Sequence, residues 1–203
     1  CLRARTEKVD GGNTIPAVTE ALAYARKIGA QIVNCSWGQR ARLQEYIDEM
    51  HRGSVQEILY VAAVGNGGQD LDASPIYPAC FPLPNVLPIL ATGKDDGPLR
   101  LIREVVTNFG KKSVLVGAPG TQILTTVPGG GRIQYTTASD TSTAAAVASG
   151  VAALVKSANP ALSAPELIKV LGETADPVAE LSQYCRTGKR INAYRAVLRA
   201  AGK

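Results

Sequence analysis

The stretch TTASDTSTAAAVASGVAALVK, Thr136–Lys156, places hydroxyl side chains directly before a segment of mostly small residues. Its composition predicts a polar turn followed by a helix over 141–158. Ser142 falls in the first turn of this helix, where free backbone N–H groups and the helix dipole favour negative charge. It is therefore a candidate nucleophile whose own N–H can face an oxyanion. Taken alone, the run Ser139–Thr143 is more simply explained as helix caps.

Outward from this helix, short apolar runs alternate with helical patterns, and we expect a single α/β unit over residues 1–203. The runs are apolar throughout, which is typical of strands buried on both faces of a mostly parallel sheet in a three-layer fold. Glycines in PGGG predict a hairpin between QILTTV and RIQYTT. The expected strands are QIVNCS, ILYVAAV, NVLPIL (interrupted by Pro88) and SVLVGA, and the expected helices cover about 15–28, 42–50, 141–158, 164–172 and 192–201.

Composition argues against several classes of protein. With 203 residues, 45% hydrophobic and 19% charged, the chain is long enough to bury a full core. Its net charge of +5 is scattered without aromatic interleaving, so we predict no nucleic-acid binding. We predict no signal peptide at CLRARTEK and no membrane span. The alternation from Leu2 to Arg5 indicates a strand already under way, so we expect further sequence before Cys1.

The four cysteines show no C-x-x-C spacing, so neither a zinc site nor a thioredoxin-like motif is predicted. Cys35 follows an apolar run and is expected to be a small buried residue. Disulfides among the other cysteines, and hence the redox compartment, stay open.

Four motifs follow one another along the chain: NCSWG at 34–38, VAAVGNGG at 61–68, GAPGTQILTTVPGG at 117–130 and SDTSTAAAVASGVAALV at 139–155. Their order resembles that of the subtilisin-like serine proteases, the subtilases. The typical forms in that family are approximately N-x-S-L-G, A-A-G-N, A-P-G-x-x-I-x-S and S-G-T-S-M-A-x-P-H-V-A-G. Smaller similarities, such as TNFG at 107–110, extend the resemblance from about Leu2 to the C-terminus.

The resemblance implies that Ser142 is the nucleophile and that Asn66 is the side-chain donor of the oxyanion hole. A tetrahedral intermediate needs two donors aimed at one oxygen, and the Asn66 amide with the Ser142 N–H would supply them. Alone, VGNGG would be an ordinary glycine turn or a phosphate loop. A nucleotide-binding domain is disfavoured because the loop lacks the G-x-G-x-x-G and Walker spacings.

The resemblance also implies an extended peptide substrate held by backbone pairing, with a pocket for the side chain before the cut bond. Ile76 falls where many relatives carry glycine at the pocket floor, and Gly67 offers no acid to attract Lys or Arg. We therefore expect a shallow pocket that prefers small or modest apolar side chains. The implied substrate-binding residues are Ser36, Trp37 and Gly38 on one side and Ala63, Val64 and Gly65 on the other, with Ile76 as the floor.

The base and the orienting acid that a nucleophilic serine needs have no motif support here. In the family both come before the segment that corresponds to residue 1. His51 is the only histidine, and its polar surroundings indicate a surface residue. We expect the catalytic Asp and His on an associated N-terminal fragment or chain, on an absent segment, or lost, so that the isolated chain is inactive. The acids without support are Asp10, Asp70, Asp72, Asp95 and Asp96.

The missing catalytic histidine and Asp140 favour a second hypothesis, an inactive pseudoprotease that binds a peptide or partner, whereas the presence of Ser142 and Asn66 favours the enzyme. Asp140 replaces the glycine before Thr-Ser, where its carboxylate would oppose an oxyanion or instead cap the helix. Ala146 and Val147 replace Pro-His, which predicts a straighter helix, and Trp37 replaces a leucine. No catalytic metal is expected, although structural calcium is left open. An extracytoplasmic location is the expectation, because most relatives are exported, although intracellular ones exist.

Overall fold

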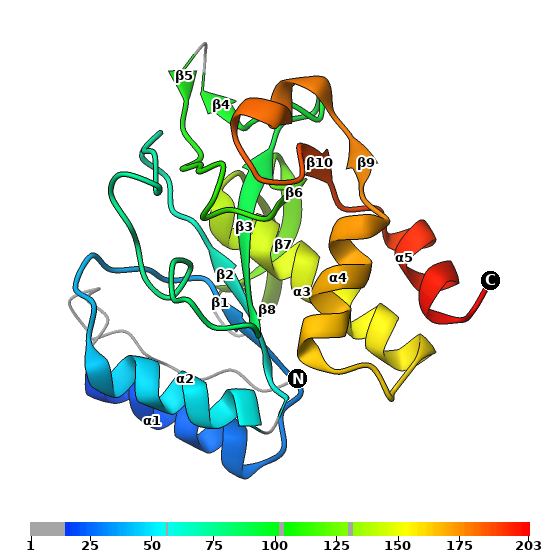
Figure 1. The fold of residues 1–203 in the computed structure, drawn as a ribbon. Helices are drawn as coiled ribbons and strands as arrows, with labels where there is room; N and C mark the ends of the chain where they lie inside the picture. Colours follow the sequence, from blue (N-terminus) through cyan, green and yellow to red (C-terminus); the bar gives the residue numbers. More distant parts are fainter. Residues whose placement is uncertain (1–14, 56, 102–103, 130–131) are drawn as a thin grey trace.

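A six-stranded sheet forms the centre of the protein (Figure 1). The computed structural model describes residues 15–55, 57–101, 104–129 and 132–203. The strands lie in the order β1-β2-β3-β6-β10-β9, and all neighbours are parallel except β10 and β9. The predicted mostly parallel α/β fold is thus confirmed. The bounds are β1 Ile32–Cys35, β2 Leu59–Ala63, β3 Val86–Thr92, β6 Val116–Pro119, β9 Asp176–Pro177 and β10 Lys189–Arg190.

Helices cover both faces of the sheet. Successive side chains of β2 point to opposite faces, so they show which helices pack on which face. Val61 belongs to the core beneath α3, α4 and α5, whereas Tyr60 belongs to the core beneath α1 and α2. Figure 1 shows the two groups of helices on either side of the sheet. The helices are α1 Ile15–Lys27, α2 Gln44–Val55, α3 Thr141–Ala158, α4 Ala164–Glu173 and α5 Ala193–Ala200, with a 3-10 helix at Ala179–Gln183.

Two small antiparallel pairs lie outside the main sheet. The hairpin predicted around PGGG is present as β7, Ile123–Gly129, paired with β8, Arg132–Ala138, while residues 130–131 lie outside the described residues. The other pair joins β4, Arg100–Leu101, to β5, Glu104–Val105. Because β8 ends at Ala138, the hairpin leads directly into the start of α3.

The parallel register determines where the functional loops leave the sheet. Cys35 is paired with Ala62, so β1 and β2 end next to each other at the same edge. The segments that follow, starting at Ser36 and Val64, therefore emerge side by side. Ligands of open parallel sheets usually bind at this carboxyl edge.

The strand predictions need two refinements. The run at Ile32–Cys35 was expected to be buried on both faces, but among the described residues β1 is an edge strand with Asn34 exposed. Pro88 does not interrupt β3, because pairing with β6 begins only at Ile89–Val116 and the missing proline N–H falls just before it. The strand expected at Leu2–Arg5 lies outside the described residues.

Most helix predictions hold, with shifted ends. After α1 the chain reverses at Gly29, whose φ of +70° suits glycine. Helix α2 starts two residues later than expected and continues to Val55. Helix α4 begins with a capping box, in which the Ser163 side chain accepts a hydrogen bond from the backbone of Glu166.

Candidate active site

Ser142 is the second residue of α3, as its sequence position predicted. Asp140 is the N-cap, and its carboxylate accepts hydrogen bonds from the Thr143 N–H at 2.7 Å and from the Thr143 hydroxyl at 2.9 Å. Its backbone is ordinarily extended, with φ −168°, so no glycine is required there. Of the two interpretations of Asp140, the structure therefore shows the helix cap.

The Ser142 hydroxyl lies against the segment that follows β1. Its Oγ donates to the Ser36 carbonyl at 3.3 Å, and the Ser36 hydroxyl donates to the Ser142 carbonyl at 3.0 Å. The Asn34 amide in turn donates to the Ser36 hydroxyl at 2.8 Å. A backbone carbonyl orients a hydroxyl but does not take up its proton, so these contacts place Ser142 without activating it.

Asn66 lies next to the first turn of α3. Its Oδ1 accepts a hydrogen bond from the Thr141 N–H at 2.9 Å. The neighbouring Gly65 N–H donates to the buried Thr141 hydroxyl at 3.1 Å. Within the described part of the chain, the Asn66 Nδ2 has no hydrogen-bond partner and is left as a free donor beside Ser142's turn.

Thr141 is a further residue of this candidate site, and the sequence motifs did not indicate its contacts with the Asn66 loop. It connects the Asn66 loop to α3 through both its backbone N–H and its hydroxyl. Its position directly before Ser142 was the one available signal. The sequence pattern predicts only a helix cap at Thr141, whereas its hydroxyl accepts a hydrogen bond from the neighbouring loop.

Ile76 lies between the two segments that were expected to enclose the substrate pocket. A Cβ on Gly38 would be 2.7 Å from Ile76 Cγ2, and a Cβ on Gly65 would be 3.5 Å from Ile76 Cδ1. Reciprocal backbone hydrogen bonds of 2.9 and 2.8 Å join Gln39 to Tyr77 and fix this neighbourhood. The Ile76 side chain thus fills the space that a glycine would leave empty.

The three implied substrate residues before Asn66 differ in their exposure to solvent. The Ala63 and Val64 side chains are buried, at 4% and 0% exposure, and the backbone of Val64 bonds to Ile89 and Asn108. Of the three residues on that side, only Gly65 is partly exposed. Any contact of Ala63 or Val64 with a peptide would therefore be indirect.

Trp37 is anchored to helix α2 instead of extending freely into solvent. Its indole N–H donates to the Tyr46 hydroxyl at 2.6 Å. Burial raises the pKa of Tyr46 far above its ordinary value, so this hydroxyl stays neutral. Burial likewise raises the pKa of the Cys35 thiol, which therefore does not compete with Ser142 as a nucleophile.

His51 does not approach Ser142. It is exposed on α2, which packs against the face of the sheet opposite α3. Of the acids without motif support, Asp10 lies outside the described residues. Each of the other four accepts hydrogen bonds from groups other than Ser142 and His51. Asp70 accepts from the Asp72 N–H, Asp72 from Lys112 and Ser113, Asp95 from the Gly97 N–H, and Asp96 from Arg190.

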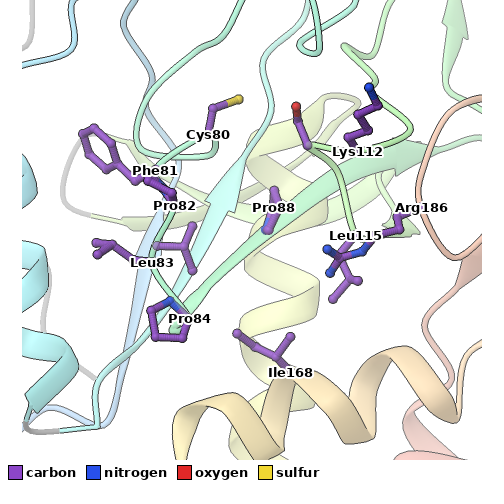
Figure 2. A pocket seen from close by; sticks show the side chains of 12 residues that line it. Cys80, Phe81, Pro82, Leu83, Pro84, Pro88, Lys112, Leu115, Ile168 and Arg186 are labelled. Atoms are coloured by element: carbon purple, nitrogen blue, oxygen red, sulfur yellow. The ribbon is translucent and has the colours of Figure 1, made fainter.

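A cavity of about 340 Å³ lies away from Ser142. Figure 2 shows the loop Pro82–Pro84 on one side of it and Leu115 and Arg186 on the other. Pro84 and Leu115 precede β3 and β6, so the cavity is at the amino edge of the sheet, whereas Asn66 follows the carboxyl end of β2. It is thus distinct from the predicted peptide site.

Three further properties of the described residues concern metal binding, membrane spans and disulfide bonds. Among them, no group of three or more His, Cys, Asp or Glu side chains could hold a metal ion. Over the same residues, no helix has the length and apolar character needed to cross a membrane. Cys35, Cys80 and Cys185 are free thiols, so disulfides among these three are absent, and Cys1 lies outside the described ranges.

Solved protease structures share this architecture. A protease from Pseudoalteromonas arctica superposes with a TM-score of 0.79 at 21% identity, covering 93% of this chain and 60% of its own. A chain of the subtilase cytotoxin assembly superposes with a TM-score of 0.78 at 26% identity, covering 94% of this chain and 66% of its own. The fold is thus that of the subtilisin-like proteases.

The chain belongs to the subtilase family, whose family model matches residues 2–202. It is 31% identical to thermitase of Thermoactinomyces vulgaris over 200 residues, which cover 97% of this chain and 64% of thermitase. The chain therefore spans less than two thirds of the length of that relative. The family is one of serine proteases.

Proposed function

We propose that this chain carries the nucleophile and oxyanion hole of a serine endopeptidase. A base takes the Ser142 hydroxyl proton as Oγ attacks the peptide carbonyl, and it returns that proton to the nitrogen as the C–N bond breaks and the amine leaves an acyl-enzyme, which water then hydrolyses. The Asn66 Nδ2 and the Ser142 N–H stabilise the oxyanion. The observation that supports this most directly is the 2.9 Å hydrogen bond from the Thr141 N–H to Asn66 Oδ1, which brings the amide to the turn of Ser142.

The base and its orienting acid come, in this proposal, from polypeptide outside residues 1–203. Ser142 has only a backbone carbonyl as acceptor, and His51 lies on the opposite face of the sheet. The described structure offers an open sheet edge at β1 and an exposed stripe on α3 where such a polypeptide would pack. The stripe consists of Ala146, Gly150 and Leu154.

The substrate in this proposal is an extended peptide with a small or modest apolar side chain before the cut bond. Ile76 carries this specificity, because its side chain lies between Gly38 and Gly65. An extracytoplasmic location is part of the same proposal and rests on the export that is usual in the family.

Replacing Ile76 by glycine is expected to shift the preferred side chain from Ala or Val towards Leu and Phe. The change in relative kcat/KM should be about tenfold, because one or two methylene-sized groups of pocket space are worth roughly 1–3 kcal/mol. A peptide library profiled on the wild-type protein and on the variants measures this. Ile76→Val is the matched control and should change little, while a wild-type profile dominated by Phe, Tyr or Lys would contradict the assignment.

A fluorophosphonate probe tests the proposed activity, because it reacts only with an activated serine. Applied to the protein together with the sequence or partner that carries the base, it should label Ser142, and Ser142→Ala should abolish labelling and peptide hydrolysis. Residues 1–203 purified alone should do neither. Hydrolysis by that isolated chain would refute the external base.

The alternative is a pseudoprotease that binds a peptide or partner without cutting it. It is favoured by the lack of a base near Ser142 in the described structure. Retention of both Asn66 and Ser142 favours the enzyme, since binding alone requires neither a nucleophile nor an oxyanion donor. Absence of probe labelling in the complete protein, with peptide binding intact, would establish the alternative.

A further inference from the structure

The loop that carries Asn66, Gly65–Gly68, is rich in glycine and therefore depends on contacts with other segments to hold one conformation. Gly65 and Gly68 both have positive φ, at +94° and +61°, and Gly67 lies between them. Glycine has more accessible backbone conformations than other residues, so such a loop needs external contacts to hold one shape. Asn66 itself is exposed, and the hydrogen bond from Thr141 holds its side chain only.

Asn108 supplies these contacts from the segment that follows β5. Its Oδ1 accepts hydrogen bonds from the Gly67 N–H at 3.0 Å and the Gln69 N–H at 2.9 Å. Its Nδ2 donates to the Val64 carbonyl at 2.8 Å, and its backbone N–H donates to the Gly65 carbonyl at 2.9 Å. The loop backbone is thus held on both sides of Asn66.

The Asn108 side chain is enclosed as well as hydrogen-bonded. Only 1% of the residue is exposed. A Cβ added to Gly65 would lie 2.7 Å from Asn108 Nδ2, so the loop packs directly on the amide. A buried amide with three hydrogen bonds from its side chain holds a precise position, because breaking them would leave polar groups unpaired.

We propose that Asn108 is a positioning residue for the oxyanion hole. It fixes the loop backbone at Val64, Gly65, Gly67 and Gln69, while Thr141 holds the Asn66 carboxamide and the Gly65 N–H, and together they direct the Nδ2 donor towards the reacting oxygen. This inference rests on the proposed peptidase activity. Asn108 touches no reacting atom, so its effect on turnover passes entirely through Asn66.

A double-mutant cycle in the complete, active protein tests this coupling. Asn108→Ala should lower kcat about 10- to 100-fold with KM changed less than about threefold, because displacing a catalytic group by about 1 Å costs on this order. On an Asn66→Ala background the same change should cost less than about threefold. Equal losses on both backgrounds would overturn the inference.

Two further variants separate positioning from a loss of folding. Asn108→Asp keeps the shape and the acceptors for Gly67 and Gln69 but loses the donor to Val64, and it should show the same dependence on Asn66. Asn85 is the matched control, because it is also 1% exposed and its amide donates to the Ile58 carbonyl at 2.7 Å, away from the loop. Asn85→Ala should lower stability while leaving the kcat of the folded protein unchanged.

The outcomes also distinguish this inference from the proposed function. An unlabelled, inactive wild-type protein would overturn both. An active wild type with additive losses from Asn66→Ala and Asn108→Ala would overturn the role of Asn108 alone.

Discussion

Replacing Asn66 by alanine is expected to lower kcat of the complete protein by about 10²–10³-fold, the magnitude known for removal of this donor in subtilisin. The amide would contribute mainly when charge develops on the carbonyl oxygen, so KM should change little. Steady-state kinetics on a short peptide measures both parameters.

Asn66→Asp is a control that separates the loss of the Nδ2 donor from the loss of the hydrogen bond to Thr141. It keeps an acceptor for the Thr141 N–H but replaces the Nδ2 donor by an oxygen. If the amide acts as an oxyanion donor, this variant should lose at least as much turnover as the alanine variant. A loss expressed mainly in KM, with kcat intact, would contradict an oxyanion role and place Asn66 among the binding residues instead.

Gly120→Ala is expected to lower the free energy of unfolding by about 1–3 kcal/mol, the usual cost of overpacking a tight core. An added Cβ would lie 2.7 Å from Ala91 Cβ, 2.8 Å from the Asp140 carbonyl oxygen and 3.1 Å from Ala144 Cβ. None of these atoms is the end of a flexible side chain. Because Asp140 caps α3, relief of the clash should also displace Ser142 and lower activity.

Urea unfolding, read as a shift in midpoint at constant slope, measures this effect. Gly150→Ala is the matched control, since a Cβ there meets nothing within 4 Å in an exposed part of α3. In residues 1–203 alone it should stabilise the helix by roughly 0.5–1 kcal/mol. A Gly120→Ala variant as stable as the wild type would show that the start of α3 is not constrained by this glycine.

Local signals in the sequence explain what could be predicted. The helix of Ser142 was predicted with its full bounds, because polar caps, small residues and helical spacing are all encoded within one stretch. Strands β2, β3 and β6 followed from their apolar runs. The position of β1 at the edge of the described sheet did not, since an apolar run does not specify how many neighbours a strand has.

Contacts between distant segments explain what could not be predicted. Asn108 and the loop it holds are brought together by the fold, and TNFG has no periodicity that would indicate a buried amide. The role of Asp140 depended on the direction of one carboxylate, which only the capping geometry with Thr143 decides. The short strands β9 and β10 have two residues each, too few to form a recognisable pattern.

The link between Trp37 and Tyr46 gives the protein an intrinsic optical reporter. Trp37 is the only tryptophan in the chain, so its fluorescence comes from a single place, beside Ser36 and Gly38. The 2.6 Å hydrogen bond holds the indole in one environment next to the proposed peptide strand. A ligand laid along that strand would exclude water from the ring and shift its emission to shorter wavelength, which makes occupancy readable without any label.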